Sequence, residues 1–352
     1  MINATFDLLE FLYSNFGMLF SLALYTVLAI ALAPSIKKNY KVYYWLFGLM
    51  SAGFVIPVVV RLCGGTMPFD LGKIPFFGLC FSELSSAANF VHPVLILIMY
   101  MGAFSPKTRY IGRLMSIRKE LSIIVGFPVI AHAMKRLFGT FVGAWEFFAD
   151  YETAIQGPRV TSVLGSCISN FVYVLGLVMF VLFLVLWITS FDSVHRKLGA
   201  KRWKSVQKWS YGLYAMLFIH AMGLNLGGYL SDAARAAQQQ QQPQTEVVVE
   251  QRQQRQQQGG EQRQQQGGEQ RQQQGGEQRQ QPQAQQAQQP QQAQAQQAGH
   301  GSRPQPFKFS EVEISRGGKR VVNMVILILL YGSYLVMRLR KARNSRKAKA
   351  SR

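Results

Sequence analysis

The sequence predicts an all-α membrane protein in which a six-helix bundle is followed by a seventh membrane helix. A membrane crossing needs about 20 apolar residues, and the chain contains seven apolar stretches of about this length. A glutamine-rich segment separates the sixth stretch from the seventh, and basic residues flank alternate loops, as they do in proteins that cross a membrane repeatedly. The candidate spans are residues 13–33, 42–62, 82–104, 120–140, 162–188, 209–229 and 321–339.

The net charge of +21 raises the question of nucleic-acid binding, which the positions of the charges answer. They concentrate beside the spans, in residues 37–41, 107–119, 196–208 and 340–352. The positive-inside rule makes these segments cytoplasmic. We therefore expect a multi-pass protein of the cell membrane with its N-terminus outside and its C-terminus in the cytoplasm, and no nucleic-acid partner. The basic tail either anchors this topology or also rests on anionic lipid headgroups.

The glutamine-rich segment is expected to be a spacer outside the cytoplasm. Residues 255–278 contain three identical copies of RQQQGGEQ, and no copy has enough apolar residues to bury a face. The segment therefore predicts a disordered region and not a solenoid. The resulting division is an N-terminal helical part with an outer loop at 1–85, a core at 86–230, the glutamine-rich segment at 231–320, the last span at 321–339 and a basic tail at 340–352.

The chain contains three cysteines and no motif of a soluble cofactor domain. Cys63 and Cys80 are both expected near the outer face, where a disulfide is permitted, and the sequence leaves their pairing open. Cys167 is expected to pack within the fifth span. G-x-G-x-x-G after a strand, the P-loop, HExxH and CxxC are all absent, which excludes a nucleotide or flavin domain of those types from this chain.

Two histidines lie at one predicted depth in the membrane. His132 is 13 residues beyond Lys119, and His220 is 12 residues beyond Lys208, so each lies about 18–20 Å from the cytoplasmic boundary. An ionisable side chain at that depth indicates a functional site. Paired neutral imidazoles in an apolar pocket suit axial ligation of haem iron. Zinc would need a third or fourth ligand, and no Asp, Glu or Cys accompanies the pair at suitable spacing.

Three more polar residues lie near this predicted haem site. Lys135 and Arg136 stand three and four residues after His132, where they either pair with haem propionates or extend to the membrane interface. His92 falls near the same depth on the third span. We interpret it as a core residue that is bonded to a backbone carbonyl freed by Pro93, and a role in a quinone site remains open.

Two stretches carry a family resemblance. IRKELSIIVGFPVIAHAMKRL (117–137) and LGAKRWKSVQKWSYGLYAMLFIH (198–220) resemble the two haem signatures of ferric-reductase-like transmembrane domains. This superfamily includes the haem subunit of periplasmic methionine sulfoxide reductase and the membrane core of NADPH oxidases. The resemblance covers about residues 86–230 and implies a core that binds haem b. It rests on Arg118, His132, Leu198, Gly199, Trp203, Tyr211 and His220.

The chain departs from its two-haem relatives at one position. Those relatives carry a second histidine 13 positions before the outer one, where this chain has Gln207, and the matching region of the other helix holds Arg118 and Lys119. The resemblance therefore implies one haem b per chain. We interpret Gln207 as a polar residue at the headgroup level, with a weak ligand or a hydrogen-bond partner as the alternatives.

The sequence therefore predicts a single-haem electron-transfer subunit of an oxidoreductase system, with no catalytic acid or base. One haem in the outer half of the membrane favours exchange with the quinone pool and with an extracytoplasmic redox protein, for which the loop at 143–154 is the candidate docking surface. The aromatic residues of that loop also fit an interfacial belt. The rival interpretations are a proton-coupled transporter that uses His92, His132 and His220, and a haem-free scaffold.

Overall fold

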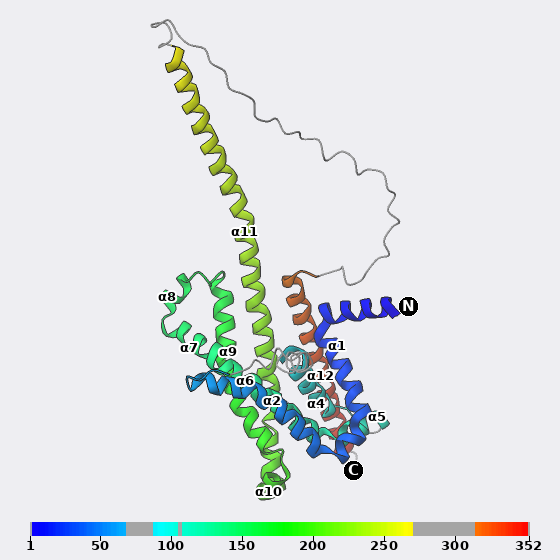
Figure 1. The fold of residues 1–352 in the computed structure, drawn as a ribbon. Helices are drawn as coiled ribbons and strands as arrows, with labels where there is room; N and C mark the ends of the chain where they lie inside the picture. The colour runs from blue at the N-terminus through cyan, green and yellow to red at the C-terminus, as the bar shows by residue number, and fades with distance from the viewer. Residues whose placement is uncertain (1, 68–86, 105–107, 270–313, 351–352) are drawn as a thin grey trace. The chain divides into compact units, whose positions relative to one another are not determined.

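The computed structural model describes residues 2–67, 87–104, 108–269 and 314–350, and this part of the chain is helical and contains no strand. The all-α prediction is confirmed for these residues (Figure 1). The elements are α1 (Ile2–Lys38), α2 (Tyr40–Leu62), the π-helical turn η2 (Ala87–Val91), α4 (His92–Met101), α5 (Arg109–Ser116), α6 (Arg118–Arg136), the π-helical turn η3 (Leu137–Phe141), α7 (Val142–Ala149), α8 (Tyr151–Gln156), α9 (Val163–Ile188), α10 (Asp192–Gln207), α11 (Ser210–Glu269) and α12 (Arg316–Ala350).

Five of the described helices are long and apolar enough to cross a membrane: Thr5–Lys38, Tyr40–Leu62, Val163–Ile188, Ser210–Gln240 and Arg316–Arg346. Large apolar side chains on them point outward, with Trp45 72% exposed, Leu49 65% and Leu329 65%. Such apolar faces suit contact with lipid, because a soluble monomer rarely exposes large contiguous apolar patches. The chain is therefore a multi-pass membrane protein.

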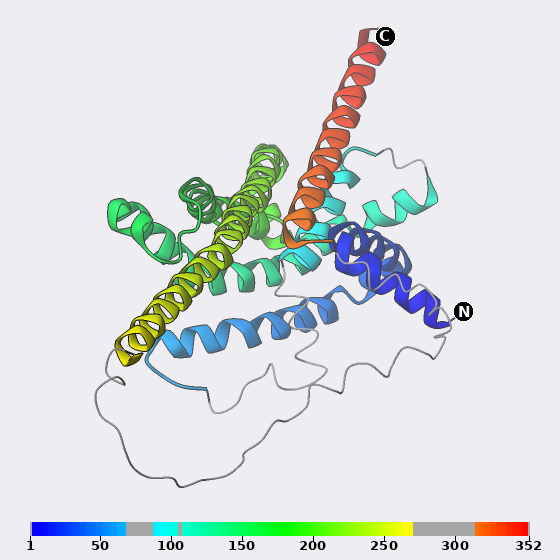
Figure 2. The ribbon, with the colours of Figure 1, turned by 90° about the horizontal axis from the view of Figure 1, so that it is seen from above.

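Two of the seven predicted spans, 82–104 and 120–140, are not among the described helices that are long and apolar enough to cross a membrane. The described part of the third is an apolar helix of residues Asn89–Met101, and residues 82–86 lie outside the described residues. In α6 the uncharged stretch runs only over residues 121–134, which is about 21 Å of helix against an apolar core of ~30 Å. The six-plus-one arrangement of spans is therefore not confirmed and stays a prediction. In the described residues α6 packs along α2 (Figure 2), where Gly48 faces the ring of Phe127.

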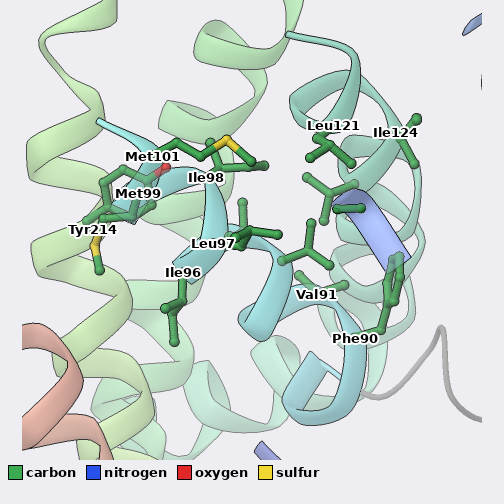
Figure 3. Close-up of a cluster of buried hydrophobic side chains, with 14 of the residues drawn as sticks. Phe90, Val91, Ile96, Leu97, Ile98, Met99, Met101, Leu121, Ile124 and Tyr214 are labelled. Atoms are coloured by element: carbon green, nitrogen blue, oxygen red, sulfur yellow. The ribbon is translucent and has the colours of Figure 1, made fainter. Parts of the chain in front are cut away.

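The short helix α4 lies at the centre of the core. Nearly all its residues are buried, including Ile96 and Met99, because a helix that is apolar on every side needs partners on every side. Figure 3 shows α4 beside Leu121 of α6 and Tyr214 of α11. α1 also packs against α4, so the histidine that begins α4 is held inside the bundle.

The predicted division of the chain into segments stays a prediction, and α11 and α12 run across some of its boundaries. Of the described residues, those up to 234 and those from 314 onward form one compact unit, and those from 235 to 269 belong to another. Residues 231–269 are the continuation of α11, where the sequence analysis expects a spacer, because Gln, Ala, Arg and Glu are good helix formers. α12 begins at Arg316 and takes in most of the basic tail. The rest of the predicted spacer, residues 270–313, lies outside the described residues, as does Cys80, so its pairing with Cys63 stays a prediction.

Candidate functional site

A cavity of about 670 Å³ lies among α1, α4, α6, α9, α11 and α12. His92, His132 and His220 all line it. Its volume falls within the roughly 300–1,000 Å³ that is usual for small-molecule and cofactor sites. His132 and His220, which the sequence places at one depth in the membrane, thus line one cavity, and His92 lines the same cavity.

His220 is oriented by a backbone group of the neighbouring helix. Its Nδ1 lies 2.7 Å from the carbonyl oxygen of Val172 on α9. A carbonyl can only accept a hydrogen bond, so Nδ1 carries the proton, and in the neutral ring Nε2 keeps its lone pair. Metal-binding histidines are typically held in this way, with the second ring nitrogen bonded to a carbonyl or a carboxylate.

Glycines allow α9 and α11 to approach closely enough for this bond. A Cβ built on Gly176 would lie 3.2 Å from Cε1 of His220. A Cβ on either Gly165 or Gly227 would lie 2.7 Å from the carbonyl oxygen of the other. Small residues let membrane helices pack backbone against backbone. The glycines therefore determine how far the His220 ring stands from α9.

Lys135 and Arg136, the predicted basic pair beside His132, differ in their position relative to the cavity. Arg136, one turn after His132 on α6, lines the same cavity. Lys135 is exposed and is not among the lining residues. Of the two cations that the sequence placed near the haem propionates, only Arg136 faces the cavity.

His92 finds its partner on α12 and not in its own helix. Its Nε2 lies 3.1 Å from the hydroxyl of Tyr331, where the sequence analysis expects a backbone carbonyl near Pro93. Lys319 and Asn323, which line the cavity from α12, were not among the site residues predicted from the sequence. The available signal was a polar residue within or beside an apolar span, which usually has a function or a partner.

Gln207 has a structural role at the end of α9. Its side-chain amide donates to the hydroxyl of Thr189 at 3.0 Å and to the carbonyl of Leu186 at 3.4 Å. The indole of Trp203 donates to the carbonyl of Thr189 at 2.8 Å. These bonds satisfy carbonyls that a helix C-terminus leaves unpaired. Of the three interpretations of Gln207, the hydrogen-bond partner is confirmed by these bonds, and its position at the headgroup level stays a prediction.

The side chains present are compatible with haem. Among the described residues, no group of three or more His, Cys, Asp or Glu is arranged to hold a metal ion. Haem iron needs only axial ligands from the protein, because the porphyrin supplies the others. His132 and His220 on different helices, one of them locked by a carbonyl, meet this smaller requirement.

Comparison with known proteins gives one relative without an assigned activity. The chain is 27% identical over 202 residues to an uncharacterized protein of Treponema pallidum (strain Nichols), a match that covers 57% of this chain. The match spans 49% of that relative, so the chain covers about half of its length. No family model and no solved structure matches the chain. The cavity is therefore the feature from which a function can be inferred.

Proposed function

We propose that this protein is a membrane-bound b-type cytochrome that holds one haem per chain between His132 and His220. It relays electrons between membrane quinol, or another donor, and an extracytoplasmic redox protein. The observation that carries the proposal is the cavity in which His132 shares space with a His220 ring locked by the Val172 carbonyl. Haem, when bound, supplies the reversible one-electron chemistry that side chains lack.

The residues of the cavity have separable roles in this function. The Val172 carbonyl fixes the tautomer of His220 and increases its strength as a ligand. Leu217 and Phe183 line the cavity and are 8% and 7% exposed. Apolar walls of this kind exclude water, and burial is one of the factors that set a redox potential.

The proposed extracytoplasmic partner would dock on α7 and α8. Trp145 is 64% exposed and Phe148 is 44% exposed, and the carboxylates of Glu146 and Asp150 are exposed beside them. The distribution of basic residues supports an outer location for these helices, with the N-terminus outside and the C-terminus in the cytoplasm. Exposed aromatic residues combined with charges are typical of protein interfaces.

An optical spectrum of the purified full chain tests the proposal. Protein made in haem-sufficient cells is recorded oxidised and dithionite-reduced, and a pyridine haemochrome counts haem per chain. We expect one haem b with low-spin bands. His132→Ala and His220→Ala should each abolish the low-spin bands, because each removes one axial ligand.

The matched control is His195→Ala. His195 packs on the ring of Trp203, with centroids 4.5 Å apart, and does not line the cavity, so its loss should leave the spectrum unchanged. Haem-free wild-type protein would contradict the proposal. So would low-spin bands that survive in both ligand variants.

One observation favours a second candidate function, proton-coupled transport. His92 is 7% exposed, lines the cavity and is hydrogen-bonded to Tyr331, and ionisable groups within membranes often form proton pathways. A colourless protein whose reconstituted vesicles show proton movement that is lost in His92→Ala would support this alternative.

A further inference from the structure

α12 is an integral wall of the bundle and lies antiparallel to the first part of α11. Near the start of α12, Nε of Arg320 lies 2.8 Å from Oδ2 of Asp232. Further along, the rings of Tyr331 and Phe218 have centroids 5.1 Å apart. Towards its end, Arg338 donates to the hydroxyl of Tyr211. The α12 numbers rise while the α11 numbers fall, which fixes the direction.

Contacts with α4 fix α12 along the same length. The hydroxyl of Tyr100 donates to the carbonyl of Leu330 at 2.6 Å. Arg338 and Lys341 donate to the carbonyl of Gly102 at 2.9 and 3.0 Å, which satisfies the C-terminus of α4. α12 is therefore held on two helices and cannot turn its cavity face outward without breaking these bonds.

The start of α12 is attached to α1 beside the cavity. The backbone N–H of Ile314 donates to the side-chain oxygen of Asn15 at 3.2 Å. Nζ of Lys319 lies 3.3 Å from the hydroxyl of Ser14. Ser14, Asn15 and Lys319 all line the cavity. The Lys319 ammonium is thereby placed at the cavity wall.

The charged side chains among the described residues that line the cavity are basic. Arg136 and Lys319 line it, and none of its described lining residues is Asp or Glu. On α12 the lining changes from Lys319 and Asn323 to Leu327, which is 1% exposed, within about 12 Å of helix. Cations beside an apolar wall match an amphipathic ligand that carries negative groups.

We infer that Lys319 of α12 and Arg136 of α6 form an anion subsite that binds the carboxylates of the ligand. This inference rests on the proposed function, under which the carboxylates are the two haem propionates. Lys319 thus takes the place that the sequence gave to Lys135, and a helix outside the six-helix core becomes part of the haem site. Two cations from different helices would also fix which way the ligand faces.

The test compares haem with haem dimethyl ester, which has the same ring and iron but no carboxylates. Apo full-length protein, made in haem-depleted cells, is titrated with each, and low-spin absorbance reports binding. The variants are Lys319→Met and Arg136→Met, with Lys319→Arg as the conservative change. Arg316→Met and Lys135→Met are the matched controls, because both residues are exposed and do not line the cavity.

We expect the wild type to prefer haem over the ester by about tenfold or more, because a charge-assisted hydrogen bond contributes at least that factor. Lys319→Met and Arg136→Met should each weaken haem binding about tenfold and leave ester binding unchanged, and Lys319→Arg and both controls should keep the preference. Equal binding of both by the wild type, or an undiminished preference in Lys319→Met, would overturn the subsite alone. Binding of neither by the wild type would overturn the proposed function and the subsite together.

Discussion

At the scale of single residues, the orientation of His220 depends on atoms that belong to other residues. The Val172 carbonyl accepts its Nδ1 proton at 2.7 Å, and the missing side chain of Gly176 leaves room for Cε1. A rotated ring would lose the bond and bury an unsatisfied N–H, which costs roughly 1–3 kcal/mol. The bond to Val172 therefore favours one orientation of the His220 ring.

Gly176→Val should displace the His220 ring, because even a Cβ there lies 3.2 Å from Cε1. We expect the free energy of unfolding to fall by about 1–3 kcal/mol, as overpacking typically causes, and the low-spin haem bands to weaken. Detergent unfolding followed by circular dichroism measures the first, and the optical spectrum measures the second. Gly212→Val is the control, since a Cβ on Gly212 meets no atom within 4 Å. An unchanged spectrum in Gly176→Val would show that this glycine does not position the histidine.

At the scale of helices, the pair α9 and α11 is held by close backbone approach. Gly165 contacts Gly227, and Val172 contacts His220. The residue number rises by seven on α9 while it falls by seven on α11, so the two helices are antiparallel and keep one register. Thr161 donates to the carbonyl of Ser231 at 3.1 Å and extends the register by another turn. Dispersion contacts between small residues are a main source of stability where lipid removes the hydrophobic effect.

Gly227→Leu should separate these two helices. A side chain at Gly227 would collide with the carbonyl of Gly165 and with Ser169, so we expect a loss of at least about 1–3 kcal/mol in unfolding free energy. Gly332→Leu makes the same change on α12 where a Cβ meets nothing within 4 Å, and it should be nearly neutral. Equal stability of the two variants would mean that α9 and α11 do not pack as described.

The pair α11 and α12 depends on a polar contact near one end. Asp232→Asn should lower the free energy of unfolding by about 1 kcal/mol, because the Arg320–Asp232 pair is only partly screened by solvent. The charge-swapped double variant Asp232→Arg/Arg320→Asp should recover much of that loss in a double-mutant cycle. A coupling energy of zero would indicate that this ion pair does not hold the two helices together.

At the scale of the whole molecule, the sequence predicted the class of protein well and the far wall of the cavity not at all. Apolar runs and loop charges are local features of the sequence, so a helical membrane protein could be predicted from them. The convergence of His132 and His220 on one cavity followed from counting helical rise. The position of α12 could not be predicted, because about 80 residues separate Asp232 from Ile314 and a long connection scarcely limits where its ends pack.

The proposed orientation has its own test at this scale. In a chain without its native cysteines, Thr153→Cys on α8 should react with a membrane-impermeant maleimide in intact cells. Ala200→Cys on α10 should react only after the membrane is permeabilised, because the surrounding basic segment is expected in the cytoplasm. Both positions are exposed, so burial does not limit the reaction. The opposite labelling pattern would reverse the topology.

The position of α12 in the bundle also sets the timing of biosynthesis. The helices that carry His92, His132 and His220 leave the ribosome well before Lys319, Asn323 and Leu327, so the nascent chain has an open-sided cavity until the glutamine-rich segment has been translated and α12 inserted. A ligand captured during translation would be held by an incomplete wall. A chain that stops within the glutamine tract would therefore retain the three histidines without the wall that Lys319, Asn323 and Leu327 complete.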